Sequence, residues 1–312
     1  EGSRVGGAGL SMFSRVVTTT TRARPVEKVI TQTRPGKALA RRFVAGDTLE
    51  EAVHVARDLN SRGMLVSLDL LGEEVHDRDS ARAARDEYLE SLGQIAEQSL
   101  QANISVKLTQ LGLAEEDELA AELLDSLAAE ALRIGTTVTI DMEDSRYTES
   151  TVGLYEKAQA NHGNLGLALQ AYLHRTPGDL ARLVPLGGHL RLCKGAYVEE
   201  ADVALGSKAD VDAAYADQLR SLMSAEEVRP AIATHDLDLV NLARELARDR
   251  RQPFEFQMLF GVRTTLQKEL VEAGYPLRVY LPFGSQWYPY LTRRLAERPS
   301  NAWFFVRSLL GS

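Results

Sequence analysis

The sequence contains one cysteine, Cys193, which lies inside an apolar stretch. A single cysteine excludes an internal disulfide framework and a CxxC metal site, and it gives no sign of an oxidising compartment. No apolar run approaches the roughly 20 residues that a membrane-spanning helix requires, and no signal-peptide pattern is present. Together these absences predict a cytoplasmic enzyme.

An excess of basic residues is also absent, since 36 Lys and Arg stand against 44 Asp and Glu. The formal net charge is −8 and the isoelectric point is near 5.4, which argues against a nucleic-acid partner. The sequence has no GxGxxG after a predicted strand and no GxSxG, so neither a Rossmann dinucleotide-binding fold nor a serine hydrolase is indicated. The 6 histidines are scattered without the spacing of a catalytic metal site, so we predict no metal.

The first part of the chain differs in composition from the rest. Residues 1–11 are glycine-rich and precede the first methionine, and we interpret them as a remnant of an expression tag. Residues 12–62 are predicted to form an N-terminal helical segment, and residues 63–312 a catalytic domain. Near the end of the helical segment, Asp47 is predicted to cap a helix, with Glu50 at the third position after it.

Eight short apolar runs, each followed by a helical pattern, make up most of the remaining chain. They occupy residues 64–72, 103–112, 136–144, 165–173, 189–197, 231–236, 254–261 and 276–284. Buried apolar runs that alternate with helices indicate parallel strands joined by right-handed crossovers. Eight such units predict an α/β fold, a (β/α)8 TIM-type barrel, with N-terminal capping helices and a substrate-covering helix after the eighth strand.

Polar side chains interrupt each of these apolar runs near one end. They are Asp69, Lys107, Asp141, Glu143, Gln170, Arg191, Lys194, Thr234, His235, Asp236, Glu255, Gln257 and Tyr280. Functional groups of such barrels lie at the carboxyl ends of the strands, and buried polar groups are costly unless they are paired or used. We therefore predict an active site at this rim. A structural ion pair, for example Lys107 with Asp141, is the alternative interpretation of the same signal.

The stretch YLPFGSQWYPYLTRRLAE, residues 280–297, combines a phenol with two guanidinium groups. At about 3.6 residues per turn, Tyr290 lies on the same helix face as Arg293 and Arg294. Paired arginines suit a carboxylate, because each guanidinium can donate to both of its oxygens. The simpler interpretation is a solvated helix face on which one arginine pairs with Glu297.

Seven segments follow one another along the chain: SVKLTQLG, TIDMEDS, LQAYL, RLCKGAY, ATHD, FEFQMLFG and RVYLPFGSQWYPYLTRRLAERPSN. In this order they closely resemble the bacterial proline dehydrogenase family, whose barrel is also one domain of the proline-utilisation A proteins. The resemblance implies FAD at the barrel mouth and oxidation of L-proline to Δ1-pyrroline-5-carboxylate by hydride transfer to flavin N5. It further implies that electrons pass to a membrane quinone, in the first step of proline catabolism to glutamate.

The resemblance also implies roles for individual residues. Asp141 and Arg191 would be catalytic, with Arg191 near flavin N5. Proline would be bound by Lys107, Tyr280, Tyr290, Arg293 and Arg294. FAD would be lined by Met142, Gln170, Arg191, Lys194, Gly195, Ala196, Tyr197, Thr234, His235 and Gln257. Without substrate, we expect Glu73 to pair with Arg293 or Arg294 and so to gate the site.

Two other classes of function remain open from the residues alone. One is a Schiff-base lyase on the same barrel, with Lys107 as nucleophile and Asp141 as its proton partner. The other is a barrel that binds an amino acid through Arg293 and Arg294 without catalysis. For the flavoenzyme, the quinone acceptor implies peripheral contact with the inner face of the cytoplasmic membrane, since no spanning segment is present.

Overall fold

The computed structural model describes residue 38, residues 40–72 and residues 75–296, with the backbone alone for 293–296. Eight parallel strands close into a barrel in chain order, with the last strand hydrogen-bonded to the first. The strands are β1 (Leu65–Leu70), β2 (Ala102–Val106), β3 (Val138–Ile140), β4 (Leu165–Gln170), β5 (His189–Cys193), β6 (Arg229–Ala233), β7 (Glu255–Leu259) and β8 (Leu277–Phe283). The predicted (β/α)8 barrel is therefore confirmed.

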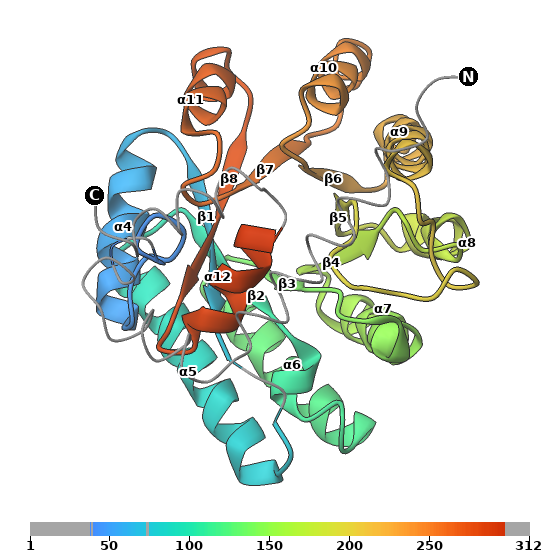
Figure 1. The fold of residues 1–312 in the computed structure, drawn as a ribbon. Coiled ribbons are helices and arrows are strands. Elements are labelled where there is room, and N and C mark those ends of the chain that lie inside the picture. The colour runs from blue at the N-terminus through green and yellow to red at the C-terminus, as the bar shows by residue number, and fades with distance from the viewer. Residues whose placement is uncertain (1–37, 39, 73–74, 297–312) are drawn as a thin grey trace, which may run out of the picture.

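Helices surround this barrel. They are α4 (Leu49–Ser61), α5 (Arg78–Glu97), α6 (Asp117–Arg133), α7 (Thr148–His162), α8 (Thr176–Leu183), α9 (Lys208–Ser224), α10 (Leu237–Leu246), α11 (Thr264–Glu272) and α12 (Trp287–Ala296). Short 3-10 turns are η1 (Leu108–Leu111), η2 (Ser145–Tyr147) and η3 (Val184–Leu186). In Figure 1, α12 lies over the strands rather than in the outer ring. None of the helices in the described ranges is both long and apolar enough to span a membrane.

The start of α4 illustrates how local sequence sets a helix boundary. Thr48 has an extended backbone, and its hydroxyl accepts a hydrogen bond from Glu51 N at 3.3 Å. The Glu51 carboxylate in turn accepts from Thr48 N at 3.4 Å, which completes a capping box. The predicted pair, Asp47 with Glu50, is wrong by one residue, because the threonine rather than the aspartate occupies the cap position.

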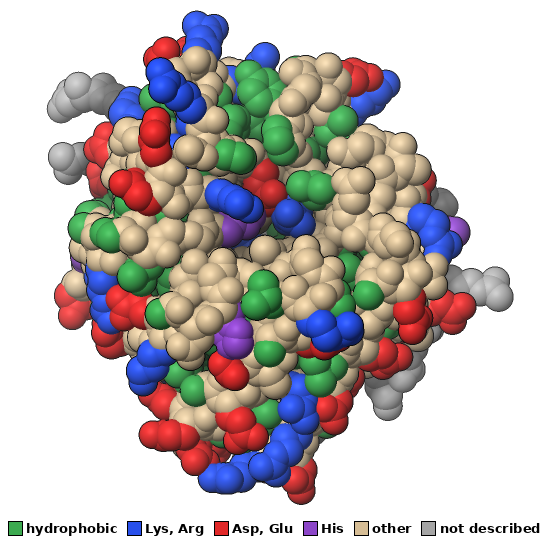
Figure 2. Space-filling model, turned by 180° about the vertical axis from the view of Figure 1, so that it is seen from behind, with side chains coloured by type: hydrophobic (Ala, Val, Ile, Leu, Met, Phe, Trp, Pro, Cys, Tyr) green, Lys and Arg blue, Asp and Glu red, His purple; other side chains and the backbone are tan. Residues whose placement is uncertain are grey.

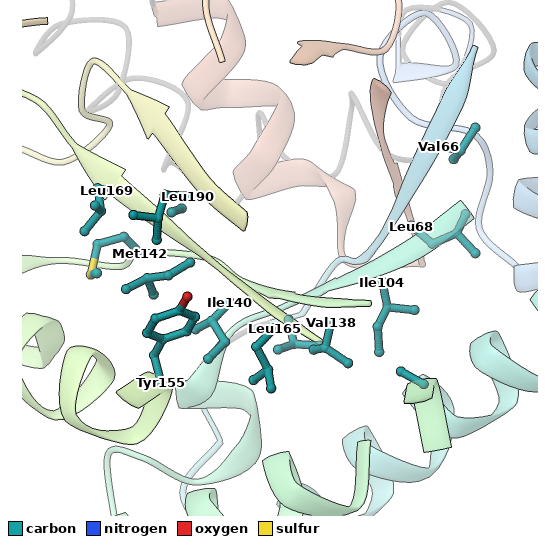
Figure 3. Close-up of a cluster of buried hydrophobic side chains, with 14 of the residues drawn as sticks. Val66, Leu68, Ile104, Val138, Ile140, Met142, Tyr155, Leu165, Leu169 and Leu190 are labelled. Atoms are coloured by element: carbon teal, nitrogen blue, oxygen red, sulfur yellow. The ribbon is translucent and has the colours of Figure 1, made fainter. Parts of the chain in front are cut away.

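The apolar core lies between the strands and the helices around them. Buried outward-facing strand residues include Val66, Leu68, Ile104, Val106, Val138, Ile140, Leu165, Leu167, Leu190, Leu192, Phe256, Val279 and Leu281. Figure 3 shows part of this layer, where strand side chains such as Ile140 and Leu165 meet Tyr155 of α7. Burial of an aliphatic or aromatic side chain contributes about 1.5–3 kcal/mol, so this layer provides the hydrophobic stabilisation of the barrel.

The inside of the barrel is polar. Side chains alternate across a strand, and in β1 the two polar residues, Ser67 and Asp69, share the inward face. The register sets Ser67 beside Asn103 and Asp69 beside Ser105 of β2. The interior of such a barrel is usually filled by branched aliphatic side chains. Buried polar groups are stable here because most of them bond to one another.

Four polar residues, Asn103, His189, Glu255 and Arg278, form a lower layer near the amino ends of their strands. Arg278 donates from Nε and Nη2 to the Glu255 carboxylate at 2.6 and 3.1 Å, and from Nη1 to Asn103 Oδ1 at 3.2 Å. His189 Nε2 lies 3.6 Å from Glu255 Oε1. On the side of the molecule away from α12, basic, acidic and histidine side chains gather near the centre of the face (Figure 2).

The placement of Glu255 corrects the sequence-based prediction. Glu255 was predicted to lie at the active-site rim with Gln257, but it is the first residue of β7. Its carboxylate therefore lies at the amino end of the barrel, opposite the carboxyl ends of the strands. The apolar run at 254–261 carries polar groups along its inward face rather than at one end.

The lower layer predicts a pH dependence of stability. Burial lowers the pKa of His189 to about 4, from 6.5. An unfolded chain therefore binds a proton here as the pH falls through 6.5, whereas the folded chain does so only near pH 4. The stability linked to His189 is complete above pH 6.5 and is lost as the pH falls toward 4. His189→Gln should reduce this loss of unfolding free energy by up to about 3 kcal/mol.

Urea denaturation at about pH 7.5 and about pH 4.5 measures the difference. Glu255 contributes little in this window, because the stability linked to its carboxyl is lost mainly as the pH falls from its ordinary pKa of 4.5 toward the folded pKa of about 2. An equally steep pH dependence in His189→Gln would show that this imidazole is not the titrating group.

Candidate active site

Asp141 is the centre of a polar cluster at the carboxyl ends of four strands. Its Oδ1 accepts from Ser105 Oγ at 2.6 Å and from Arg191 Nη1. Its Oδ2 accepts from the Tyr280 hydroxyl at 2.6 Å and lies 3.8 Å from Lys107 Nζ. Residues from β2, β5 and β8 thus meet at the residue that follows β3. Of the residues predicted at this rim, the structure brings Lys107, Asp141, Arg191 and Tyr280 together.

The closest partner of Lys107 is Asp69. Lys107 Nζ donates to Asp69 Oδ1 at 2.5 Å, and Asp69 is 1% exposed. The structural ion pair and the Schiff-base lyase, the two alternatives considered from the sequence, both pair Lys107 with Asp141. In the structure, Asp141 is the more distant of the two carboxylates. Burial alone would lower the pKa of Lys107, but the charges of Asp69 and Asp141 outweigh it and raise that pKa. The amine therefore holds its proton at neutral pH.

The two carboxylates differ in their electrostatic surroundings. Burial would raise the pKa of Asp141, but the positive charges of Arg191 and Lys107 hold it below its ordinary value. Burial raises the pKa of Asp69, against the opposing charge of Lys107. Burial and the neighbouring Asp141 also raise the pKa of Tyr280 well above its ordinary value, so its hydroxyl remains a donor. The ionised cluster contains two cations and two carboxylates and is close to neutral.

Arg191 reaches across the barrel interior. It is 4% exposed, and its Nε donates to Gln257 Oε1 at 2.5 Å, while Nη1 lies 3.2 Å from Ser105 Oγ. Its guanidinium carbon is 5.4 Å from the centroid of the Tyr280 ring. The remaining nitrogen, Nη2, is buried and has no hydrogen-bond partner among the described residues. A buried cationic donor of this kind has capacity for one more acceptor.

A fixed turn follows β5. Gln170 is 3% exposed, and its Oε1 accepts from Ala196 N at 3.0 Å, while its Nε2 donates to Glu143 O at 2.9 Å. Gly195 has a φ of +138°, and a Cβ there would lie 2.4 Å from the Tyr172 ring, so only glycine fits. The Tyr172 hydroxyl donates to Tyr197 O at 3.2 Å. Gln170 therefore positions the backbone of this turn.

Lys194 already has two acidic partners. Its Nζ donates to Asp212 Oδ1 at 2.5 Å and to Asp236 Oδ2 at 2.8 Å, which links β5 to the starts of α9 and α10. A phosphate group at this position would compete with both carboxylates. The role of Lys194 toward the cofactor stays a prediction.

The remaining predicted cofactor residues lie near the carboxyl ends of β3 and β6. His235 Nε2 accepts from Leu259 N at 3.0 Å, which places the imidazole proton on Nδ1. Thr234 is 4% exposed and its hydroxyl accepts from the Asp236 backbone at 3.1 Å. Met142 is 7% exposed and belongs to the main apolar core. The role of these three residues toward the cofactor stays a prediction.

Helix α12 carries three of the five predicted substrate residues, Tyr290, Arg293 and Arg294. Tyr290 is buried in a small apolar cluster with Trp287, Tyr288, Leu291, Phe43, Val44, Ala40 and Leu71. The side chains of Arg293 and Arg294 lie outside the described residues, as does Glu73. The carboxylate clamp and its gate therefore stay predictions.

Ser105 is not among the residues predicted from the sequence, and Asp69 is predicted at the rim without an individual role. Both lie in strands whose polar residues alternate with apolar ones, as in VSLDL and NISVK. That alternation, followed through every strand, would have placed Ser105 in the interior. In the described ranges, no group of three or more His, Cys, Asp and Glu is arranged to hold a metal ion.

The pairing of Asp141 predicts a large stability effect. Asp141→Asn keeps the size of the side chain but leaves Arg191 buried without its counter-ion, which typically costs about 3–5 kcal/mol. Asp144→Asn is the matched control, because Asp144 pairs with Arg146, whose side chain is 70% exposed. That exposed pair should contribute less than about 1 kcal/mol. Urea denaturation compares the two, and equal losses of unfolding free energy would contradict a special role for the interior pair.

Comparison with known proteins agrees with the geometry. Residues 52–307 match the family model described as proline dehydrogenase. The chain is 40% identical over 275 residues to Proline dehydrogenase 1 of Bacillus subtilis subsp. natto, covering 87% of this chain and 90% of that protein. It is 35% identical over 283 residues to the proline dehydrogenase of Deinococcus radiodurans, again covering 87% and 90%.

A crystal structure of proline utilization A from Bdellovibrio bacteriovorus, inactivated by N-propargylglycine, has the same fold. The TM-score is 0.80 at 22% identity, over 91% of this chain and 36% of that chain. The family model and the sequence identities, rather than this likeness of fold, decide the assignment. The chain belongs to the proline dehydrogenase family.

Proposed function

We propose that this protein oxidises L-proline to Δ1-pyrroline-5-carboxylate, with FAD as the hydride acceptor and a membrane quinone as the final electron acceptor. The proposal makes it the enzyme of the first step of proline catabolism. The observation that carries it is the buried cluster of Lys107, Asp141, Arg191 and Tyr280 in a chain of this family. The resemblance to the family implies a catalytic or substrate-binding role for each of these residues.

The charge of the cluster supports a substrate clamp on α12. Asp69 and Asp141 already neutralise Lys107 and Arg191. A substrate carboxylate therefore needs cations from outside this cluster, and α12 carries the adjacent pair Arg293 and Arg294 in its sequence. Arginine suits this task, because its planar fork donates to both oxygens of a carboxylate.

The residues present fit FAD. Arg191 Nη2 is a buried donor with no partner among the described residues, and the turn at Gly195–Tyr197 offers backbone groups held in place by Gln170. The residues that would hold the cofactor are Met142, Gln170, Arg191, Lys194, Gly195, Ala196, Tyr197, Thr234, His235 and Gln257. When bound, FAD would supply the two-electron acceptor for the hydride that leaves the ring carbon next to the proline nitrogen.

The chain contributes orientation, electrostatics and exclusion of water. Arg191 would place a fixed positive charge near the flavin, and such preorganised charge is often the largest single contribution to catalysis. The Tyr280 ring would line one side of the pocket for the pyrrolidine ring. Its hydroxyl would keep its proton and donate it in the hydrogen bond to Asp141 Oδ2. Lys107 holds its own proton at Nζ and so cannot take one from the proline amine. We assign no protein base for that proton, which leaves solvent as its acceptor.

The same protonation state weakens the Schiff-base alternative. A lysine nucleophile needs a neutral amine at working pH, which enzymes obtain by lowering its pKa. Here Asp69 and Asp141 act in the opposite direction and raise the pKa of Lys107. The flavoenzyme is therefore the better supported of the two catalytic classes, and amino-acid binding without catalysis is separated from it by experiment.

Cofactor spectroscopy tests the reaction class. We expect the purified protein to be yellow, to bleach with L-proline under anaerobic conditions, and to recover its colour when a quinone is added. Protein that stays colourless after reconstitution with FAD would refute the proposed reaction. Borohydride trapping of a carbonyl substrate on Lys107 would instead establish the lyase, and unchanged absorbance with bound proline would indicate a binding protein.

Replacement of the α12 arginines tests the clamp. Arg293→Met and Arg294→Met should each raise the KM for L-proline by about 10- to 150-fold, because a hydrogen bond to a charged group contributes about 1.5–3 kcal/mol. Arg220→Met on α9 is the control, since Arg220 is 54% exposed and pairs with Asp217 on the surface. Steady-state kinetics at fixed FAD content measures the effect. A KM in either α12 variant equal to that of Arg220→Met would refute the clamp.

A further inference from the structure

A chain of hydrogen bonds joins the lower layer of the barrel to Arg191. Gln257 Nε2 donates to Glu255 Oε1 at 2.6 Å, and Gln257 Oε1 accepts from Arg191 Nε at 2.5 Å. Glu255 is itself clamped by two nitrogens of Arg278. Glu255 and Gln257 are 7% and 4% exposed, so water has little access to either side chain. The amino-end carboxylate thus acts on the predicted flavin-side arginine through one intervening amide.

The chemistry of the two partners fixes which way the Gln257 amide faces. An ionised carboxylate can only accept hydrogen bonds, whereas an amide has a donating and an accepting end. Burial would raise the pKa of Glu255, but Arg278 and His189 outweigh it and lower that pKa to about 2, so the group is ionised across the physiological range. Because the Glu255 carboxylate can only accept, Gln257 must direct its NH2 group toward Glu255. Its oxygen is then left to face Arg191.

If the Gln257 amide were reversed, its NH2 group and the Arg191 Nε–H, both hydrogen-bond donors, would face each other. The buried Nε–H of Arg191 would then lose its acceptor, which is costly. Asp141 and Ser105 hold the Nη1 end of the guanidinium from the β2 and β3 side. Gln257 holds the Nε end from β7. Loss of the Gln257 contact at Nε would let the guanidinium rotate about its Nη1 contacts with Asp141 and Ser105.

We propose that Glu255 is a positioning residue for the oxidation reaction, which acts through Gln257 to hold the Arg191 guanidinium in its working orientation. The inference rests on the proposed function, in which Arg191 contacts the flavin. Glu255 touches neither substrate nor cofactor in this scheme. Its effect on catalysis therefore depends on Gln257 being present, which a residue with a purely structural role would not require.

A double-mutant cycle with Glu255→Gln and Gln257→Met in the FAD-loaded full chain tests this dependence. The glutamine at 255 keeps size and shape but can donate as well as accept, so it no longer dictates the direction of the neighbouring amide. Glu255→Gln should lower the limiting rate of flavin reduction by L-proline by about 10- to 100-fold, as loss of supporting hydrogen bonds commonly does. In the Gln257→Met background the same change should have less than about a 2-fold effect.

Asn103→Ser is the control variant. Asn103 shares the lower layer, and among the described residues its side chain bonds to Arg278, Thr137 and Thr139 rather than to Gln257. Its reduction rate should stay within about 2-fold of the parent protein, whatever happens to its stability. Equal rate losses for Glu255→Gln with and without Gln257, or a loss in Asn103→Ser as large as in Glu255→Gln, would overturn the proposal.

An exchange of the two groups gives a second test that does not depend on Glu255→Gln folding well. The variant E255Q/Q257E inverts the pair, so that the amide at 255 donates to a carboxylate at 257, which again offers an acceptor to Arg191. We expect it to reduce flavin at least about 5-fold faster than E255Q, or to fold where E255Q does not. An exchange variant that is no better than E255Q in rate or folding would contradict the mechanism.

A crystal structure of E255Q separates this inference from the reaction itself. We expect the Arg191 guanidinium to move away from residue 257 in that structure, and an unmoved Arg191 would overturn the proposal. Failure of the parent protein to bleach with L-proline would refute the proposed function alone, because the position of Arg191 can be determined without any substrate.

Discussion

Arg191 is a cation enclosed in a barrel, and its ion pair with Asp141 is the interaction on which the rest of the interior depends. An unpaired ion in a medium of low dielectric constant costs on the order of tens of kcal/mol, so a guanidinium at this depth requires a carboxylate. The second oxygen of Asp141 also needs a donor, which the Tyr280 hydroxyl supplies. The positive charge of Lys107 lies near the same oxygen. Lys107 is itself a buried cation, and its ion pair with Asp69 compensates its charge.

This chain of requirements explains why the interior of the barrel is polar. Each strand presents apolar residues to the helices and polar or small residues to the interior, so hydrophobic stabilisation and chemistry occupy opposite faces of the same strands. The layer around Ile140 and Tyr155 holds the barrel closed without using the inward positions. The interior is thereby available for a network that continues from the lower layer to the rim.

The fold could be predicted from the order of apolar runs and helices, because that rhythm depends only on local pattern. The pairing inside the barrel could not, because it depends on register and on which side chains meet across the interior. Lys107 illustrates the limit: the sequence predicts both Asp69 and Asp141 at the rim, but only the distances in the structure show that Asp69 is the main partner. Glu255 illustrates a different error. Strand β7 carries inward-facing polar groups from its amino end onward, so a polar residue in the apolar run does not by itself mark the carboxyl end of the strand.

Helix α12 packs against the segment before α4, near the predicted substrate site. Ala45 N donates to Pro282 O at 2.8 Å and Gly284 N donates to Gly46 O at 2.9 Å, so the segment before α4 is fastened to the end of β8. The same segment packs against the first turns of α12. The barrel cluster itself is close to charge-neutral, so the proposed recognition of the proline carboxylate depends on this helix. Under the proposed function, α12 would recognise the substrate carboxylate while the interior network would orient the flavin-side arginine. A change in α12 is then expected to alter proline binding without disturbing the interior network.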